Sequence, residues 1–151
     1  MSSAQTRWLT PDQQRIWRAY LEGVARIDRA MEARLRPFGL ALSEYEILVR
    51  LSEADDRTMR MSDLADAVRQ SRSRLTHTVG RMEAKGLLTR QPCPDDRRGV
   101  HALLTDAGYD LLVAAAPDHV ASVREAFVDV VDPADFEALG RAMAAVAAVG
   151  Q

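Results

Sequence analysis

The chain has 151 residues and a formal net charge of −2, and aromatic residues make up only 5% of it. This length fits one domain or one subunit of an oligomer, and the shortage of aromatic residues beside many small aliphatic ones favours packed helices over a β-sandwich. The first residues lack the apolar run of a signal peptide, no stretch is long and apolar enough to span a membrane, and a single cysteine excludes an intrachain disulfide framework, so we expect a cytoplasmic protein.

Two helices are predicted in the first third of the chain. The first begins at Thr10-Pro11, a cap residue followed by a proline that suits the first helical position, and it ends before Pro37. The second is expected to begin at Ser43, with Glu46 completing a capping box.

The middle of the chain predicts short helices followed by a hairpin. "MRMS" is long enough for one short strand, Ser62 is expected to cap a brief helix, and a longer helix should run from Ser71 to Gly86. Two β-prone runs, "LLTRQP" and "VHALLT", then flank the turn-rich "CPDDRRG", which predicts a hairpin with a long charged tip.

Two further helices are predicted toward the C-terminus. Thr105 should cap a long helix that reaches about Val131 with a kink at Pro117, and Asp132-Pro133 opens the last helix. The whole order predicts a mainly α (α+β) fold, a winged helix-turn-helix with long helices at both ends.

Charge is distributed unevenly along the chain. Residues 67–101 contain eight Arg or Lys and three acids, a local charge of +5, whereas the remainder contains twelve basic and nineteen acidic residues. Such asymmetry indicates an anionic partner for the basic segment, although a solvated basic surface is the alternative on charge alone.

The helix predicted from Ser71 separates apolar from basic and polar residues. At helical spacing, Leu75, Val79 and Met82 form one inward stripe, and no acid occurs between Asp66 and Glu83. Small polar side chains and arginines on the other side suit the major groove of double-stranded DNA, where they can contact bases and phosphates. The candidate DNA-binding residues of this helix are Ser71, Arg72, Ser73, Arg74, Thr76, His77 and Arg81.

Two segments resemble a known family. "DDRRGVHALLTDAGYDLL" resembles the wing of the MarR (multiple-antibiotic-resistance regulator) family of bacterial transcription factors, with the family's spacing at Asp96, Arg98, Thr105 and Gly108. "SRSRLTHTVGRMEAKGLLTR" is similar to the family's recognition helix and the strand after it. The resemblance covers about the central 60 residues closely.

The resemblance implies a homodimeric DNA-binding regulator. Residues 41–105 would form the DNA-binding domain and residues 1–40 and 106–151 the helical dimerisation region, with the recognition helix in the major groove and the wing in the adjacent minor groove. Arg97 and Arg98 become candidate DNA contacts, with the motif position favouring Arg98, and Asp96 would stabilise the wing by pairing with an arginine.

Departures from the family pattern lie on the DNA-facing side of the helix. Gly80 stands where relatives often have a carboxylate, Arg74 where they have a small or β-branched residue, and His77 where arginine is more usual. The operator sequence of relatives therefore cannot be transferred to this chain.

Relatives are often released from DNA by small aromatic acids or oxidants, which makes this chain a candidate repressor. A pocket for a small aromatic or phenolic ligand would be lined by Trp17, Tyr20, Met31, Tyr45 and Tyr109, although core packing is the favoured alternative for these residues. Oxidant sensing through Cys93 and non-specific, nucleoid-type DNA binding are the alternatives. We expect no enzyme, cofactor or metal site, because no catalytic motif occurs and the histidines lack metal-ligand spacing.

Overall fold

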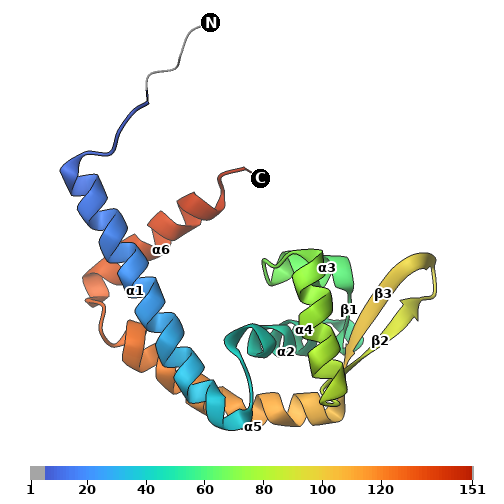
Figure 1. Ribbon diagram of the computed structural model, residues 1–151. Helices are drawn as coiled ribbons and strands as arrows, with labels where there is room; N and C mark the ends of the chain where they lie inside the picture. Colours follow the sequence, from blue (N-terminus) through green and yellow to red (C-terminus); the bar gives the residue numbers. More distant parts are fainter. Residues whose placement is uncertain (1–5, 151) are drawn as a thin grey trace, which may run out of the picture. The chain divides into compact units, whose positions relative to one another are not determined.

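The structure, a computed structural model, describes residues 6–150 (Figure 1), and these residues form two compact units. One unit comprises Met31–Ser122, and the other combines the described residues up to Ala30 with those from Val123 onward. Within the described part of the chain, no helix has both the length and the hydrophobicity required to cross a bilayer.

The first helix, α1 (Pro11–Leu35), begins where the sequence predicts. Thr10 Oγ1 accepts a hydrogen bond from the backbone N–H of Gln13 at 3.2 Å, and Gln13 Oε1 accepts one from the N–H of Thr10 at 2.9 Å. A single 3₁₀ turn follows α1, and Gly39 then takes a left-handed conformation with φ of 69°. This reversal, which glycine adopts without strain, leads into the second helix.

The start of α2 (Leu42–Glu53) differs from the prediction. Ser43 is not the cap residue; Ala41 holds that position without a side-chain cap, and Glu44 instead of Glu46 turns back to accept the Ala41 N–H at 3.1 Å. The physical reason is that Glu44 is buried and pairs with Lys85, which sets the helix two residues earlier.

The short strand β1 (Thr58–Arg60) leads directly into α3 (Met61–Ala67). The predicted cap at Ser62 is therefore wrong: Arg60 occupies the cap position with an extended backbone and no side-chain cap, because the strand continues to the residue before the helix.

The helix α4 (Arg72–Ala84), which is the predicted recognition helix, begins as predicted. Ser71 Oγ accepts the backbone N–H of Arg74 at 3.2 Å, which satisfies one of the free donors of the first turn. Beyond the helix end, Gly86 has a φ of 74°, the left-handed conformation that commonly follows a C-terminus.

Strands β2 (Leu88–Cys93) and β3 (Asp96–Leu104) form the hairpin, and β1 completes an antiparallel sheet of order β1-β3-β2 (Figure 1). The prediction of a long charged tip is wrong. Strand β3 already begins at Asp96, so only residues 94 and 95 form the turn. The pairing skips residues 97–99, since Pro92 pairs with Val100 whereas Cys93 pairs with Asp96.

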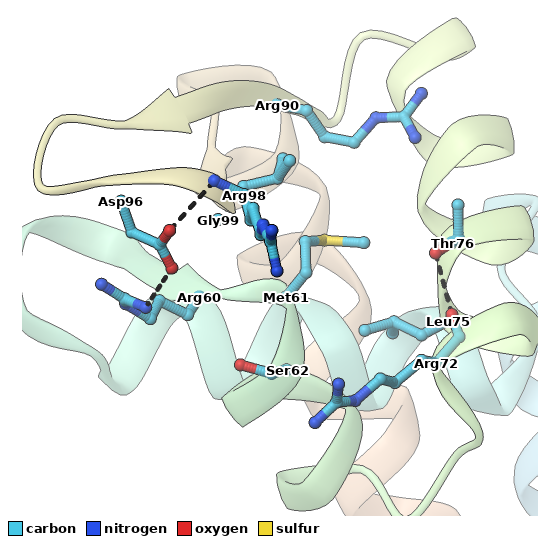
Figure 2. A pocket seen from close by; sticks show the side chains of 11 residues that line it. Arg60, Met61, Ser62, Arg72, Leu75, Thr76, Arg90, Asp96, Arg98 and Gly99 are labelled. Carbon is cyan, nitrogen blue, oxygen red and sulfur yellow. Dashed lines mark hydrogen bonds and ion pairs between the residues drawn. The ribbon is translucent and has the colours of Figure 1, made fainter.

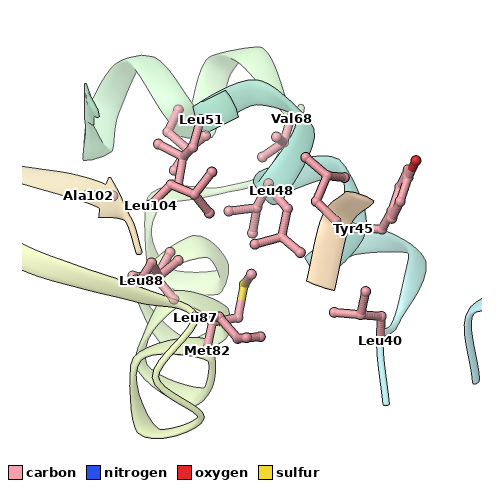
Figure 3. Close-up of a cluster of buried hydrophobic side chains, with 14 of the residues drawn as sticks. Leu40, Tyr45, Leu48, Leu51, Val68, Met82, Leu87, Leu88, Ala102 and Leu104 are labelled. Carbon is pink, nitrogen blue, oxygen red and sulfur yellow. The ribbon is translucent and has the colours of Figure 1, made fainter. Parts of the chain in front are cut away.

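A leucine-rich core joins α2, α3, α4, α5 and the sheet within the Met31–Ser122 unit (Figure 3). Leu48, Leu64 and Leu88 are fully buried, and each comes from a different element. The core consists of Leu35, Leu40, Tyr45, Ile47, Leu48, Leu51, Leu64, Ala65, Val68, Leu75, Val79, Met82, Leu87, Leu88, Ala102, Leu104, Leu112 and Ala115.

The helix α5 (Asp106–Val123) is anchored at its start by Thr105. Thr105 Oγ1 donates to the Gly86 carbonyl at 2.7 Å and accepts the Gly108 N–H at 3.0 Å, so one hydroxyl joins the end of the recognition helix to the start of α5. Pro117 lies inside the helix.

The predicted continuation of this helix to about Val131 holds only in part. The α-helix gives way to a π-helical turn, Arg124–Val128, before the chain reaches α6 (Pro133–Ala147). Asp132 caps α6 as predicted, accepting the Ala134 N–H at 2.8 Å.

The described helices of the other unit bury almost nothing within one chain. None of residues 6–30 and 123–150 is buried, and the exposed apolar side chains include Trp17, Leu21 and Val146. In proteins, most of the stability of a helix comes from the packing of its apolar face against another element.

We predict that Gly108→Ala destabilises the protein by about 2–3 kcal/mol, a cost typical of overpacking. A Cβ atom at this position would overlap the Leu87 carbonyl oxygen, a backbone atom that cannot move aside cheaply. Urea unfolding of the variant and of the parent protein, which is the control, measures the effect. A Gly108→Ala midpoint equal to the control's would contradict this packing.

Candidate nucleic-acid interface

The recognition helix α4 buries one side and exposes the other. Leu75, Val79 and Met82 are buried in the core, as the sequence predicts. All of the predicted DNA-binding residues of this helix and the wing are exposed, namely Ser71, Arg72, Ser73, Arg74, Thr76, His77, Arg81, Arg97 and Arg98.

The two ends of α4 differ in electrostatic environment. Among residues 6–150, no carboxylate pairs with Arg72 or Arg74 at the N-terminal end, which is also the positive end of the helix dipole. At the other end, Arg81 Nε lies 4.0 Å from a carboxylate oxygen of Glu44, and Lys85 is closer. Unpaired positive charge is therefore concentrated at the start of the helix.

The hydroxyl groups of α4 are partly used within the helix. Thr76 Oγ1 donates to the Arg72 carbonyl at 2.8 Å, and Thr78 Oγ1 donates to the Arg74 carbonyl at 3.0 Å. Thr78 is buried, whereas Thr76 is exposed and keeps its oxygen as an acceptor for an external group.

A cleft of about 420 Å³ lies between α4, the start of α3 and the hairpin (Figure 2). Four arginines line it: Arg60, Arg72, Arg90 and Arg98. The sequence did not single out Arg60 or Arg90, because each sits in a strand and only the fold brings it to this cleft. The residues lining the cleft suit a phosphate group better than an apolar ligand.

Asp96 is the only carboxylate in the lining of this cleft. One of its oxygens accepts the backbone N–H of Arg98 at 3.0 Å, and the other pairs with Arg60 Nη1 at 3.4 Å (Figure 2). Asp96 therefore connects the hairpin to the end of β1. This is the arginine contact on which the predicted wing-stabilising role would depend.

Arg90 reaches from β2 to the recognition helix. Glu83 accepts the Arg90 backbone N–H at 2.8 Å and its guanidinium at 3.0 and 3.3 Å, and these bonds lower the pKa of Glu83. A Cβ added at Gly80 would lie 3.8 Å from Arg90 Nη2, an ordinary van der Waals distance, so the guanidinium lies beside the helix at this position.

The residues predicted to line an effector pocket belong to two units. Trp17 and Tyr20 stack on each other with ring centroids 5.7 Å apart. In the other unit Met31 is partly buried, Tyr45 packs against His119, and Tyr109 lies under the Arg57 guanidinium at 3.9 Å. The effector pocket stays a prediction.

Cys93 is buried at the end of β2, where a Cβ added to Gly99 would lie 2.7 Å from its sulfur. Oxidation requires an accessible thiolate, so this packing weighs against the oxidant-sensing alternative. Within residues 6–150, no three His, Cys, Asp or Glu residues come together in a way that could hold a metal ion.

Comparison with known proteins places these features in a family. A family model described as "MarR family" matches residues 38–99. The transcriptional regulator PecS of Dickeya dadantii is 32% identical over 100 residues, which are 66% of this chain and 60% of PecS, so the match spans less than two thirds of that relative.

Two solved structures from Streptomyces coelicolor match almost the whole chain. AbsC, a MarR family transcriptional regulator, has 47% sequence identity and a TM-score of 0.89, covering 94% of this chain and 96% of its own. Sco3205, a MarR family transcriptional regulator solved in complex with DNA, has 40% identity and a TM-score of 0.90, covering 94% and 90%.

A pH effect on stability follows from the packing of His119 against Tyr45, with ring centroids 4.3 Å apart. Burial lowers the pKa of His119 below 6.5, so the folded protein favours the neutral imidazole. As the pH is lowered through 6.5, this histidine therefore takes up a proton in the unfolded chain at a higher pH than in the folded chain. The free energy of unfolding consequently falls as the pH falls.

We predict that His119→Gln flattens this fall between pH 7.5 and 5, whatever its effect on absolute stability. Urea unfolding at several pH values measures the slope. His77→Gln, which removes an exposed histidine, is the control and should keep the parent's profile. An unchanged slope in His119→Gln would show that this partly buried histidine does not cause the loss of stability at low pH.

Proposed function

The chain belongs to the MarR family, and on that premise we propose that it is a sequence-specific transcriptional regulator that binds double-stranded DNA as a homodimer. The observation that carries the proposal is the exposed side of α4, whose unpaired arginines and short polar residues lie beside an arginine-lined cleft. Arginine and short polar residues on an exposed helix can read base edges, and positive charge in the cleft attracts phosphates.

The proposed contacts divide between the two grooves. The exposed polar residues of α4 and its N-terminal cap would contact bases and phosphates in the major groove. They are Ser71, Arg72, Ser73, Arg74, Thr76, His77 and Arg81. Arg97 and Arg98, in the segment of β3 that has no pairing partner on β2, would approach the minor groove.

Homodimerisation is supported by the exposed terminal helices. None of residues 6–34 and 123–150 is buried within one chain, and apolar side chains such as Trp17 and Val146 are exposed on them. Exposed apolar surface of this extent is typical of a face that a partner covers. Residues 1–40 and 106–151 are accordingly proposed as the dimerisation region and residues 41–105 as the DNA-binding domain.

Repression and release by a small aromatic or phenolic ligand complete the proposal. Support comes from the family resemblance and from the aromatic side chains outside the DNA-facing surface, Trp17, Tyr20, Tyr45 and Tyr109. A repressor should lower transcription from a promoter that contains its operator, and a releasing ligand should restore it.

Selection of bound duplexes from a random DNA pool tests the proposed function. We expect one pseudo-palindromic sequence with half-sites about 34 Å apart, because two-fold symmetry places two recognition helices one DNA turn apart. Light scattering should give about twice the 16.7 kDa chain mass. Equal affinity for all duplexes at physiological salt would indicate a non-specific binder instead.

The wing gives a second test. Arg98→Ala should lower operator affinity and reduce the log–log salt slope by about one unit for each phosphate that the variant no longer touches. Asp96→Ala should also weaken binding, although it removes a negative charge, because it frees the hairpin from Arg60. An exposed pair contributes at most about 1 kcal/mol, so the melting temperature should change little.

Asp95→Ala is the matched control for the wing. Asp95 is the neighbouring acid, exposed in the hairpin turn, and its removal changes the charge equally without breaking the ion pair between Asp96 and Arg60. If Asp96→Ala and Asp95→Ala both bind the operator more tightly than the parent, Asp96 is only a repulsive surface charge.

A further inference from the structure

Glu44 is the only buried carboxylate among residues 6–150, with 4% of its surface exposed. Removing a charged group from water is costly unless that group is paired and hydrogen-bonded. The groups that surround this carboxylate therefore indicate what it holds together.

The donors around Glu44 come from two parts of the fold. From its own helix start, the Ala41 N–H donates to Oε2 at 3.1 Å. From the C-terminal end of the recognition helix, Lys85 Nζ lies 3.4 Å from both carboxylate oxygens, and Arg81 Nε lies 4.0 Å from Oε1.

Lys85 makes one more contact, with the backbone of the turn that precedes α2. Its ammonium also donates to the Gly39 carbonyl at 3.2 Å, in the left-handed turn between α1 and α2. Lys85 therefore binds both the buried carboxylate and the backbone of the turn, so three hydrogen bonds of one ammonium group connect this end of α4 to the start of α2.

We infer that Glu44 is a positioning residue for DNA recognition, which acts through Lys85 to lock the C-terminal end of the recognition helix to the turn between α1 and α2. The base-reading residues at the other end of α4 depend on the angle of this helix. The lock sets that angle, so it affects discrimination between sequences more than attraction to phosphate. This inference rests on the proposed function.

Three substitutions separate positioning from charge. Glu44→Gln keeps the shape and removes the negative charge, and Lys85→Met removes the cation from a half-exposed side chain. Glu46→Gln is the matched control: it makes the same change on the same helix, but its ion-pair partner is Arg69, at 3.1 Å, not the recognition helix.

The measurements are the ratio of operator affinity to random-duplex affinity, the salt slope and the melting temperature, using the sequence recovered from the random pool. We expect Glu44→Gln and Lys85→Met each to lower the affinity ratio about tenfold, the size expected when a side chain that reads a base is misaligned. The salt slope should stay within a few tenths of the parent's, the double variant should bind little more weakly than either single variant, and Lys85→Arg should restore most of the ratio. Glu46→Gln should match the parent.

Other outcomes overturn the inference. Tighter binding of Glu44→Gln to both duplexes would mean that only a repulsive charge was removed, and a slope reduced by about one in Lys85→Met would identify Lys85 as a residue that binds phosphate. A lower melting temperature with an unchanged affinity ratio would leave Glu44 a purely structural residue. If the parent itself shows no sequence preference, the proposed function fails and this inference fails with it.

Discussion

The burial of one side of the recognition helix is the constraint from which the rest of this interface follows. Leu75, Val79 and Met82 fill the core beneath α4, and their spacing leaves only one way for the helix to face outward. Because these three side chains are inside, the acid-free polar side must be outside. The same packing holds α4 against the sheet, and Arg60 and Arg90 from the strands line the cleft that this arrangement forms.

Local patterns were sufficient for most of the fold. The caps at Thr10, Ser71, Thr105 and Asp132 each carry a side-chain oxygen that serves the first turn of a helix, so the sequence alone locates these helix starts. The buried apolar side of α4 could also be predicted, because helical periodicity depends only on residues that are close in the sequence.

Long-range contacts explain what the sequence could not locate. The start of α2 depends on a carboxylate at Glu44 that meets Lys85, forty-one residues away, and no local pattern reports that meeting. The hairpin tip was expected to be long because "CPDDRRG" is rich in turn residues, yet Asp96 pairs with Cys93 and shortens it. The cleft between helix and hairpin joins residues from β1, α3, α4, β2 and β3, so it exists only once the chain has folded.

Because Cys93 packs against Gly99, the reactivity of its thiol reports on opening of the hairpin. The sequence contains one thiol, and with 6% of its surface exposed a labelling reagent reaches it only when the ends of β2 and β3 separate. The rate of alkylation therefore measures how often the hairpin opens locally, as amide hydrogen exchange does for backbone groups. Any partner that holds the two strands together would slow this labelling, and the motion of the hairpin could be followed without adding a probe to the chain.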